Sequence, residues 1–128
     1  MIIYSISGSS TSKETSNEYN IAFRIGEYLA KNDIHIATGG YGGIMEAAAK
    51  GAVLYNVRRI GVTCPNHSNR MPNPYINEEI VTPTYLERLQ KLIEISDGYI
   101  VLPGGTGTLL ELSAIWALTE RKIIKEKP

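Results

Sequence analysis

Hydrophobic residues along this chain alternate between short runs rich in β-branched residues and longer stripes at helical spacing. The short runs predict strands at residues 2–6, 34–38, 59–63 and 99–102, with a short further strand at 79–81. The stripes predict helices at residues 16–32, 44–52 and 84–96, and a last helix that begins near Thr108. Because strands and helices alternate, we expect an α/β fold with a doubly wound parallel sheet covered by helices on both faces.

Composition sets limits on the class of protein. The 128 residues suit a single domain, and no segment approaches the roughly 18 apolar residues of a membrane span, so we expect a soluble protein with no membrane partner. Thirteen basic and thirteen acidic residues balance, which argues against a nucleic-acid partner. The first residues lack a signal-peptide pattern and the only cysteine is Cys64, so we expect the cytoplasm, no disulfide and no metal site. The chain stops where another strand could start, so we expect either a sheet that is short at the C-terminus or a sequence that was cut before that strand.

Three loops rich in glycine and hydroxyl side chains directly follow predicted strands. Without Cβ atoms a loop can bring backbone N–H groups close to a ligand, and a helix that starts after the loop adds its positive dipole end. The carboxyl ends of parallel strands meet at one edge of a sheet, so a single cleft can use all three loops. The candidate binding residues are Gly8, Ser9 and Ser10; Gly39, Gly40, Gly42 and Gly43; and Gly104, Gly105, Thr106, Gly107 and Thr108.

The loops fit an anion such as a nucleotide phosphate better than a dinucleotide. Met45 and Leu110 stand where the third glycine of G-x-G-x-x-G would be, and no acidic residue ends the second strand to bind a ribose diol. The lysine of a P-loop is also missing. From the residues alone the first loop fits a plain turn equally well.

Two charged residues near these loops have both a structural and a chemical explanation. Glu111 is three residues after Thr108, at capping-box spacing, so it can cap the last helix or act on a sugar held at the loop. Arg88 lies beside the apolar stripe of the helix at 84–96, where an amphipathic side chain at the edge of the core is the ordinary explanation.

The two later loops resemble a known family. The segment from Gly39 to Ala47, read as GGYGGIMEA, and the later P-G-G-T-G-T-x-x-E pattern ending at Glu111 are similar to the LOG (lonely guy) family, once described as lysine decarboxylases. The resemblance covers nearly the whole chain, residues 1–128. It implies a Rossmann-like fold in a homodimer, and hydrolysis of a nucleoside 5′-monophosphate such as AMP to free base and ribose 5-phosphate, without a cofactor.

The resemblance also implies roles for both charged residues. Arg88 matches the family's essential arginine and Glu111 its essential glutamate. The carboxylate can stabilise positive charge on the ribose or activate the attacking water, while the arginine binds phosphate or orients the carboxylate. Leu89, Thr106 and Leu110 depart from common residues of the family, which is typical of a divergent branch. That branch leaves a second hypothesis, a non-catalytic nucleotide sensor or a molybdenum-cofactor carrier.

Overall fold

A computed structural model describes residues 1–128, which form one five-stranded parallel sheet. The strand order is β4-β3-β2-β1-β5, and the predicted doubly wound, Rossmann-like α/β fold is confirmed. The strands are β1 (Ile3–Ser7), β2 (His35–Thr38), β3 (Arg59–Thr63), β4 (Glu78–Val81) and β5 (Gly98–Val101). The helices are α1 (Asn17–Lys31), α2 (Ile44–Gly51), α3 (Tyr85–Ile95) and α4 (Thr106–Glu120), with a 3₁₀ turn η1 (Pro65–His67).

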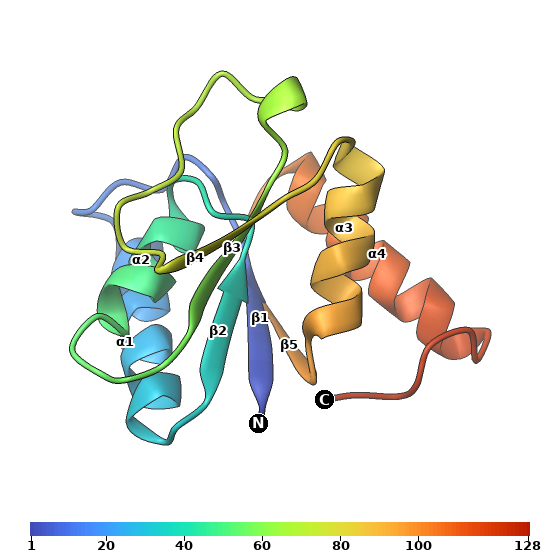
Figure 1. The fold of residues 1–128 in the computed structure, drawn as a ribbon, viewed down its shortest axis with the longest axis horizontal. Coiled ribbons are helices and arrows are strands. Elements are labelled where there is room, and N and C mark those ends of the chain that lie inside the picture. Colours follow the sequence, from blue (N-terminus) through green and yellow to red (C-terminus); the bar gives the residue numbers. More distant parts are fainter.

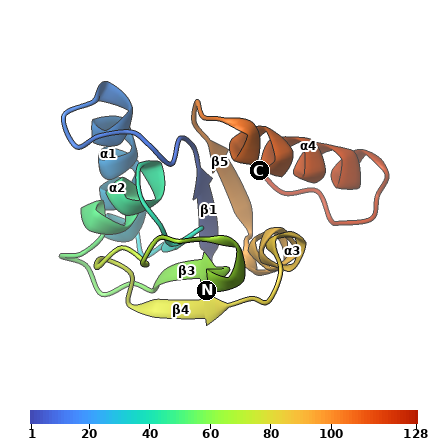
Figure 2. The ribbon, with the colours of Figure 1, turned by 90° about the horizontal axis from the view of Figure 1, so that it is seen from above.

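The helices cover both faces of the sheet, as Figures 1 and 2 show, with α1 and α2 on one face and α3 and α4 on the other. Alternate residues of one strand serve the two layers: Ile6 joins the apolar cluster with α1 and α2, whereas Ile3 joins the cluster with Leu92 of α3. The alanine-rich α2 packs closely on α1. The two helices are so near each other that a Cβ at Gly26 of α1 would collide with the backbone of Ala48 of α2. The core therefore consists of one cluster on each side of the sheet.

The helix starts agree only partly with the sequence. Thr84 is the N-cap of α3, since its Oγ1 accepts the N–H of Glu87 at 3.2 Å, while the Glu87 carboxylate accepts from the Thr84 hydroxyl at 2.8 Å. The N-cap of α1 is Ser16, so this helix begins at Asn17, one residue after the predicted start. The predicted capping box at Thr108 is wrong, because α4 begins at Thr106 with Gly105 as its N-cap. Glu111 consequently lies in the second turn of α4 and does not cap it.

The strand order fixes where a ligand site is expected. From β1 the chain moves outward through β2, β3 and β4, and then returns across the sheet to place β5 on the other side of β1. The carboxyl ends of β1 and β5 therefore form the topological switch point, the usual ligand crevice of such folds. The loops after these two strands hold Gly8 and Thr106, so the fold brings two of the predicted loops to this crevice.

No helix of the structure combines the length and the apolar character that a bilayer-spanning helix requires.

Candidate functional site

A cleft of about 340 Å³ opens at the carboxyl edge of the sheet. All three predicted loops contribute to its lining, together with α3, α4 and the segment that follows β3. The predicted residues that line it are Gly8, Ser10, Gly39, Arg88, Gly105, Thr106, Gly107, Thr108 and Glu111. The predicted residues that do not line it are Ser9, Gly40, Gly42, Gly43 and Gly104.

Three of the residues outside the lining hold the loops against one another. The N–H of Ser9 donates to the carbonyl of Pro103 at 3.0 Å, and the Ser9 carbonyl accepts the N–H of Ile44 at 2.9 Å. Gly43 has a φ of +64°, and a Cβ there would collide with the Ser9 carbonyl. A Cβ at Gly104 would lie 2.8 Å from the Ser9 nitrogen. These contacts give Gly43 and Gly104 a structural role that requires no ligand.

The two glycine loops differ in how open their helix N-termini are. At α2 the N–H of Ile44 is already bonded to Ser9. At α4 no side chain caps the helix, so the first-turn N–H groups of Thr106, Gly107 and Thr108 lack intrahelical partners and face the end where the dipole is positive. Because these residues line the cleft, the α4 terminus is the end of the cleft at which a helix dipole favours negative charge.

Arg88 is buried, with an exposed fraction of 7%, and does not lie at the edge of the core. Its Nε donates to the carbonyl of Val62 at 2.8 Å and its Nη2 to the carbonyl of Gly39 at 2.9 Å. A Cβ at Gly39 would collide with this guanidinium, so the glycine makes room for it. The third nitrogen of the guanidinium, Nη1, makes no hydrogen bond with the protein. Every fully buried side-chain N or O atom of the structure does have a hydrogen-bond partner, so Nη1 is not fully buried and is open to solvent in the cleft.

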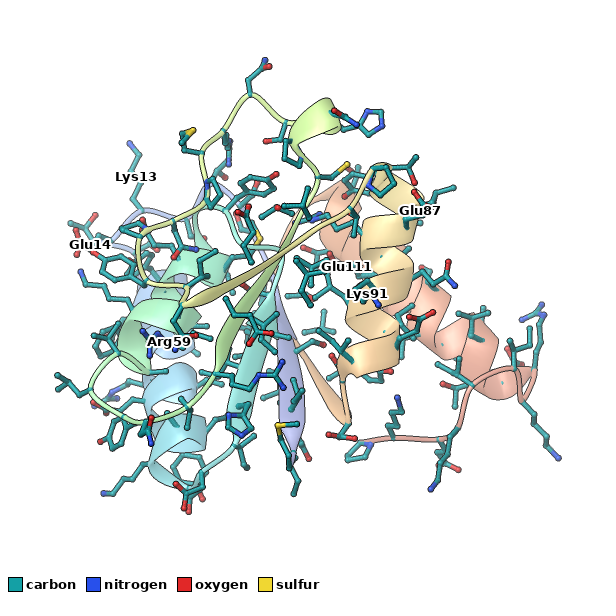
Figure 3. All side chains as sticks on the ribbon, in the orientation of Figure 1. Lys13, Glu14, Arg59, Glu87, Lys91 and Glu111 are labelled. Atoms are coloured by element: carbon teal, nitrogen blue, oxygen red, sulfur yellow. The ribbon has the colours of Figure 1, made fainter.

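Glu111 enters the same cleft from α4, and Figure 3 shows it in the space between the sheet and α3. Burial raises the pKa of its carboxyl above the ordinary value, while the Ser7 side chain and the positive charge of Arg88 act in the opposite direction. A carboxylate with a raised pKa is a stronger base than an exposed one. The cleft thus combines a fixed cation, a basic carboxylate and an open helix N-terminus.

The segment between β3 and β4 forms the outer wall of the cleft. Its buried Asn73 donates from Nδ2 to the carbonyl of Tyr41 at 2.8 Å, and its N–H donates to Gly40 at 2.9 Å. Arg70 crosses toward the first loop, where its Nη1 donates to the carbonyl of Ser10 at 3.1 Å. The segment that follows β3 therefore lies at the cleft.

Sequence reasoning missed several residues that line the cleft: Ser7, Tyr41, Met45, Cys64, His67, Ser68, Arg70 and Tyr85. Of these residues, Tyr41 could have been singled out from the sequence, because an aromatic residue between glycines is unusual for a plain turn.

Cys64 is buried, and its N–H donates to Tyr41 Oη at 3.0 Å. No group of three or more His, Cys, Asp and Glu residues lies close enough together to hold a metal ion.

Comparison with known proteins adds a family and two named relatives. A family model described as SLOG cluster4 matches residues 1–125. The chain is 38% identical over 104 residues to a pyrimidine/purine nucleotide 5′-monophosphate nucleosidase of Escherichia coli, a match that covers 75% of this chain and 23% of that protein. It is 55% identical over 40 residues to a cytokinin riboside 5′-monophosphate phosphoribohydrolase of Mycobacterium tuberculosis, covering 31% of this chain and 21% of that one. The matched segments thus cover less than a quarter of the length of either enzyme.

A solved structure with the same fold is the molybdenum cofactor binding protein from Rippkaea orientalis. The two share a TM-score of 0.76 at 27% identity, and the match covers 94% of this chain and 72% of the other. The comparisons therefore include both nucleotide hydrolases and a cofactor-binding protein.

Proposed function

This chain belongs to the SLOG cluster4 family, and from that membership and the geometry of its cleft we propose that it hydrolyses the N-glycosidic bond of a nucleoside 5′-monophosphate. The products are the free base and ribose 5-phosphate. One observation carries the proposal: Arg88 of α3 and Glu111 of α4 line one cleft beside the uncapped N-terminus of α4. The names of the Escherichia coli and Mycobacterium tuberculosis relatives support the same reaction. Residues 1–128 then form one nucleotide-binding domain.

The phosphate binds at the first turn of α4. The backbone N–H groups of Thr106, Gly107 and Thr108 and the two threonine hydroxyls supply the donors. Gly8 and Ser10 also line the cleft, on the opposite side of the switch point, and contribute to phosphate binding from there. Binding at the phosphate provides free energy remote from the bond that breaks, which positions the ribose for reaction.

Glu111 acts as the base. Its carboxylate accepts a proton from a water molecule, the water oxygen forms a bond to C1′ of the ribose, and the bond between C1′ and the base nitrogen breaks. The electron pair of that bond leaves with the base, which takes up a proton from solvent. The raised pKa of Glu111 favours the proton transfer, and its negative charge stabilises the positive charge that develops on the ribose.

Arg88 positions the carboxylate of Glu111 and stabilises its negative charge. A guanidinium stays protonated at any ordinary pH, so it does not serve as a proton donor. The Val62 and Gly39 carbonyls hold two of its nitrogens, which fixes the remaining Nη1 toward the cleft. From there it stabilises the ionised form of Glu111 and contacts the bound sugar phosphate.

The experiment is incubation of the purified protein with a panel of nucleoside monophosphates, followed by chromatography of the bases and assay of ribose 5-phosphate. We expect equal amounts of the two products from at least one nucleotide, and a loss of about 10²-fold or more in Glu111→Gln. Glu27→Gln removes an exposed carboxylate of α1 and serves as the matched control. If wild type releases no base from any nucleotide yet binds one tightly, the hydrolase proposal is wrong.

The similarity to the Rippkaea orientalis protein favours a second candidate, a carrier of a phosphorylated pterin cofactor. The open α4 terminus suits the phosphate of such a ligand equally well. A carrier needs no base, so its ligand affinity would be unchanged in Glu111→Gln, and it would release no ribose 5-phosphate. The raised pKa of Glu111 beside Arg88 favours the hydrolase.

We also propose that the protein acts as a homodimer through α4. Its residues Leu109, Leu112 and Trp116 have exposed fractions of 62%, 41% and 68% and follow one another at i, i+3 and i+7 on one face. Such a stripe is costly in water. Sedimentation should show a dimer that Trp116→Ser weakens, whereas a monomeric wild type would contradict the proposal.

A nucleotide substrate and a free cysteine both fit the cytoplasm, which we propose as the compartment.

A further inference from the structure

The side chain of Tyr85 lies between Arg88 and the first turn of α4, although no sequence motif marks this tyrosine. It is the first residue of α3 and lies one turn before Arg88. The centre of its ring is 5.6 Å from Cζ of Arg88, and the ring of Tyr41 lies 5.5 Å from the same atom. Two aromatic rings at these distances attract the guanidinium and restrict its position.

The two tyrosines differ in what their hydroxyl groups do. Tyr41 is buried and its Oη accepts the N–H of Cys64 at 3.0 Å. Tyr85 has an exposed fraction of 38%, it lines the cleft, and its Oη makes no hydrogen bond with the protein. Of the two, Tyr85 is the more exposed, and its hydroxyl has no partner in the protein.

The hydroxyl of Tyr85 lies beside the first turn of α4. A Cβ at Gly107 would be 3.0 Å from Tyr85 Oη, which is tighter than ordinary packing. Glycine at this position therefore leaves space for the phenol oxygen next to the uncapped N–H groups of Thr106 and Thr108. An O–H donor at this place adds to a set of donors that already suits an anion.

We propose that Tyr85 is a substrate-binding residue whose hydroxyl donates a hydrogen bond to the 5′-phosphate, while its ring positions Arg88. The proposal rests on the proposed function, because it takes the ligand to be a ribose 5-phosphate ester bound at α4. It adds a residue that reaches from the phosphate to the arginine, so that phosphate binding and the placement of Arg88 depend on one side chain.

The two parts of Tyr85 are separated by two substitutions. Tyr85→Phe removes only the hydroxyl, and Tyr85→Leu removes the ring as well. Tyr28→Phe, at a tyrosine of α1 with an exposed fraction of 68%, is the matched control. Ribose 5-phosphate and ribose serve as the two probes in calorimetric titrations, so that dependence on the phosphate is measured directly and without turnover.

For Tyr85→Phe we expect ribose 5-phosphate to bind about tenfold or more weakly, since a hydrogen bond to a charged group is lost, with no change in the binding of ribose. With a hydrolysed nucleotide its KM should rise and its kcat stay within about twofold. Tyr85→Leu should in addition lower kcat, because Arg88 loses one of its two rings.

The outcomes separate this inference from the proposed function. If wild type cleaves nucleotides and Tyr85→Phe binds ribose 5-phosphate as tightly as wild type, the inference is wrong and the proposed function stands. If binding of ribose 5-phosphate depends on the hydroxyl but no nucleotide is cleaved, the inference stands and the hydrolase proposal fails. If wild type binds neither ribose 5-phosphate nor any nucleotide, both are overturned.

Discussion

Replacing Glu111 with glutamine should make the protein more stable while it removes activity. The carboxyl lies in the cleft, where burial raises its pKa above the ordinary value even though Arg88 and Ser7 oppose the shift. The folded state therefore binds this proton more tightly than the unfolded state does. Consequently the free energy of unfolding of wild type falls as pH rises from the ordinary carboxyl pKa through the raised one. Glutamine keeps the shape of the protonated acid and has no charge to desolvate.

The magnitude follows from the same linkage. Each unit by which the folded pKa is raised lowers the stability of wild type by about 1.4 kcal/mol once the pH is above that pKa. For a chain of this size about 1 kcal/mol corresponds to roughly 3–6 °C in Tm. Glu111→Gln should therefore be more stable than wild type at pH 8, and the difference should become smaller as the pH falls toward the ordinary carboxyl pKa, where the protonated form of Glu111 predominates in both states.

The assay is urea denaturation followed by circular dichroism at a series of pH values between 4 and 8. Glu27→Gln is the control, because that carboxylate is exposed on α1 and makes no hydrogen bond. Its difference from wild type should be small at every pH. A Glu111→Gln protein that is less stable than wild type at pH 8, or whose difference from wild type does not vary with pH, would refute the reasoning.

Three further predictions concern the same cleft. Arg88→Lys keeps the charge but loses the planar fork that donates to both the Val62 and the Gly39 carbonyl. We therefore expect kcat/KM to fall by about 10²-fold and the free energy of unfolding by about 1–3 kcal/mol. A kcat/KM at the wild-type level would contradict this prediction. Gly43→Ala should lose about 1–3 kcal/mol in urea denaturation from its positive φ alone, and more from the collision with Ser9, so an unchanged midpoint would contradict the assigned backbone. The pH profile of kcat/KM should fall on the acid side with an apparent pKa above 4.5, because Glu111 must lose its proton to act as a base; a lower value would exclude that role.

The sequence allowed the layout of the fold to be predicted, because that layout depends on local pattern. Runs such as residues 99–102 have few alternatives to a buried strand, and the alternation of strands and helices leaves few topologies. The start of the helix at 84–96 could also be predicted, since a threonine whose Oγ1 caps the N–H three residues later is a local pattern. The meeting of Arg88 and Glu111 in one cleft follows from the parallel strands, whose carboxyl ends share one edge.

What could not be predicted depends on contacts between distant segments. The glycines at positions 43 and 104 make room for the first loop, more than 30 residues away, so their spacing alone looked like ligand binding. Arg88 is buried because the ends of β2 and β3 offer it two carbonyls, which no local pattern reveals. The start of α4 was placed two residues late because glycine at its N-cap carries no side-chain signal.

The most direct test of the central claim is a crystal structure of the Glu111→Gln variant with a nucleoside monophosphate bound. The account predicts the phosphate within hydrogen-bonding distance of the backbone N–H groups of Thr106, Gly107 and Thr108, with C1′ of the ribose facing the side chain at position 111. A nucleotide bound outside this cleft, or one with its base at the first turn of α4 and its phosphate in solvent, would contradict it.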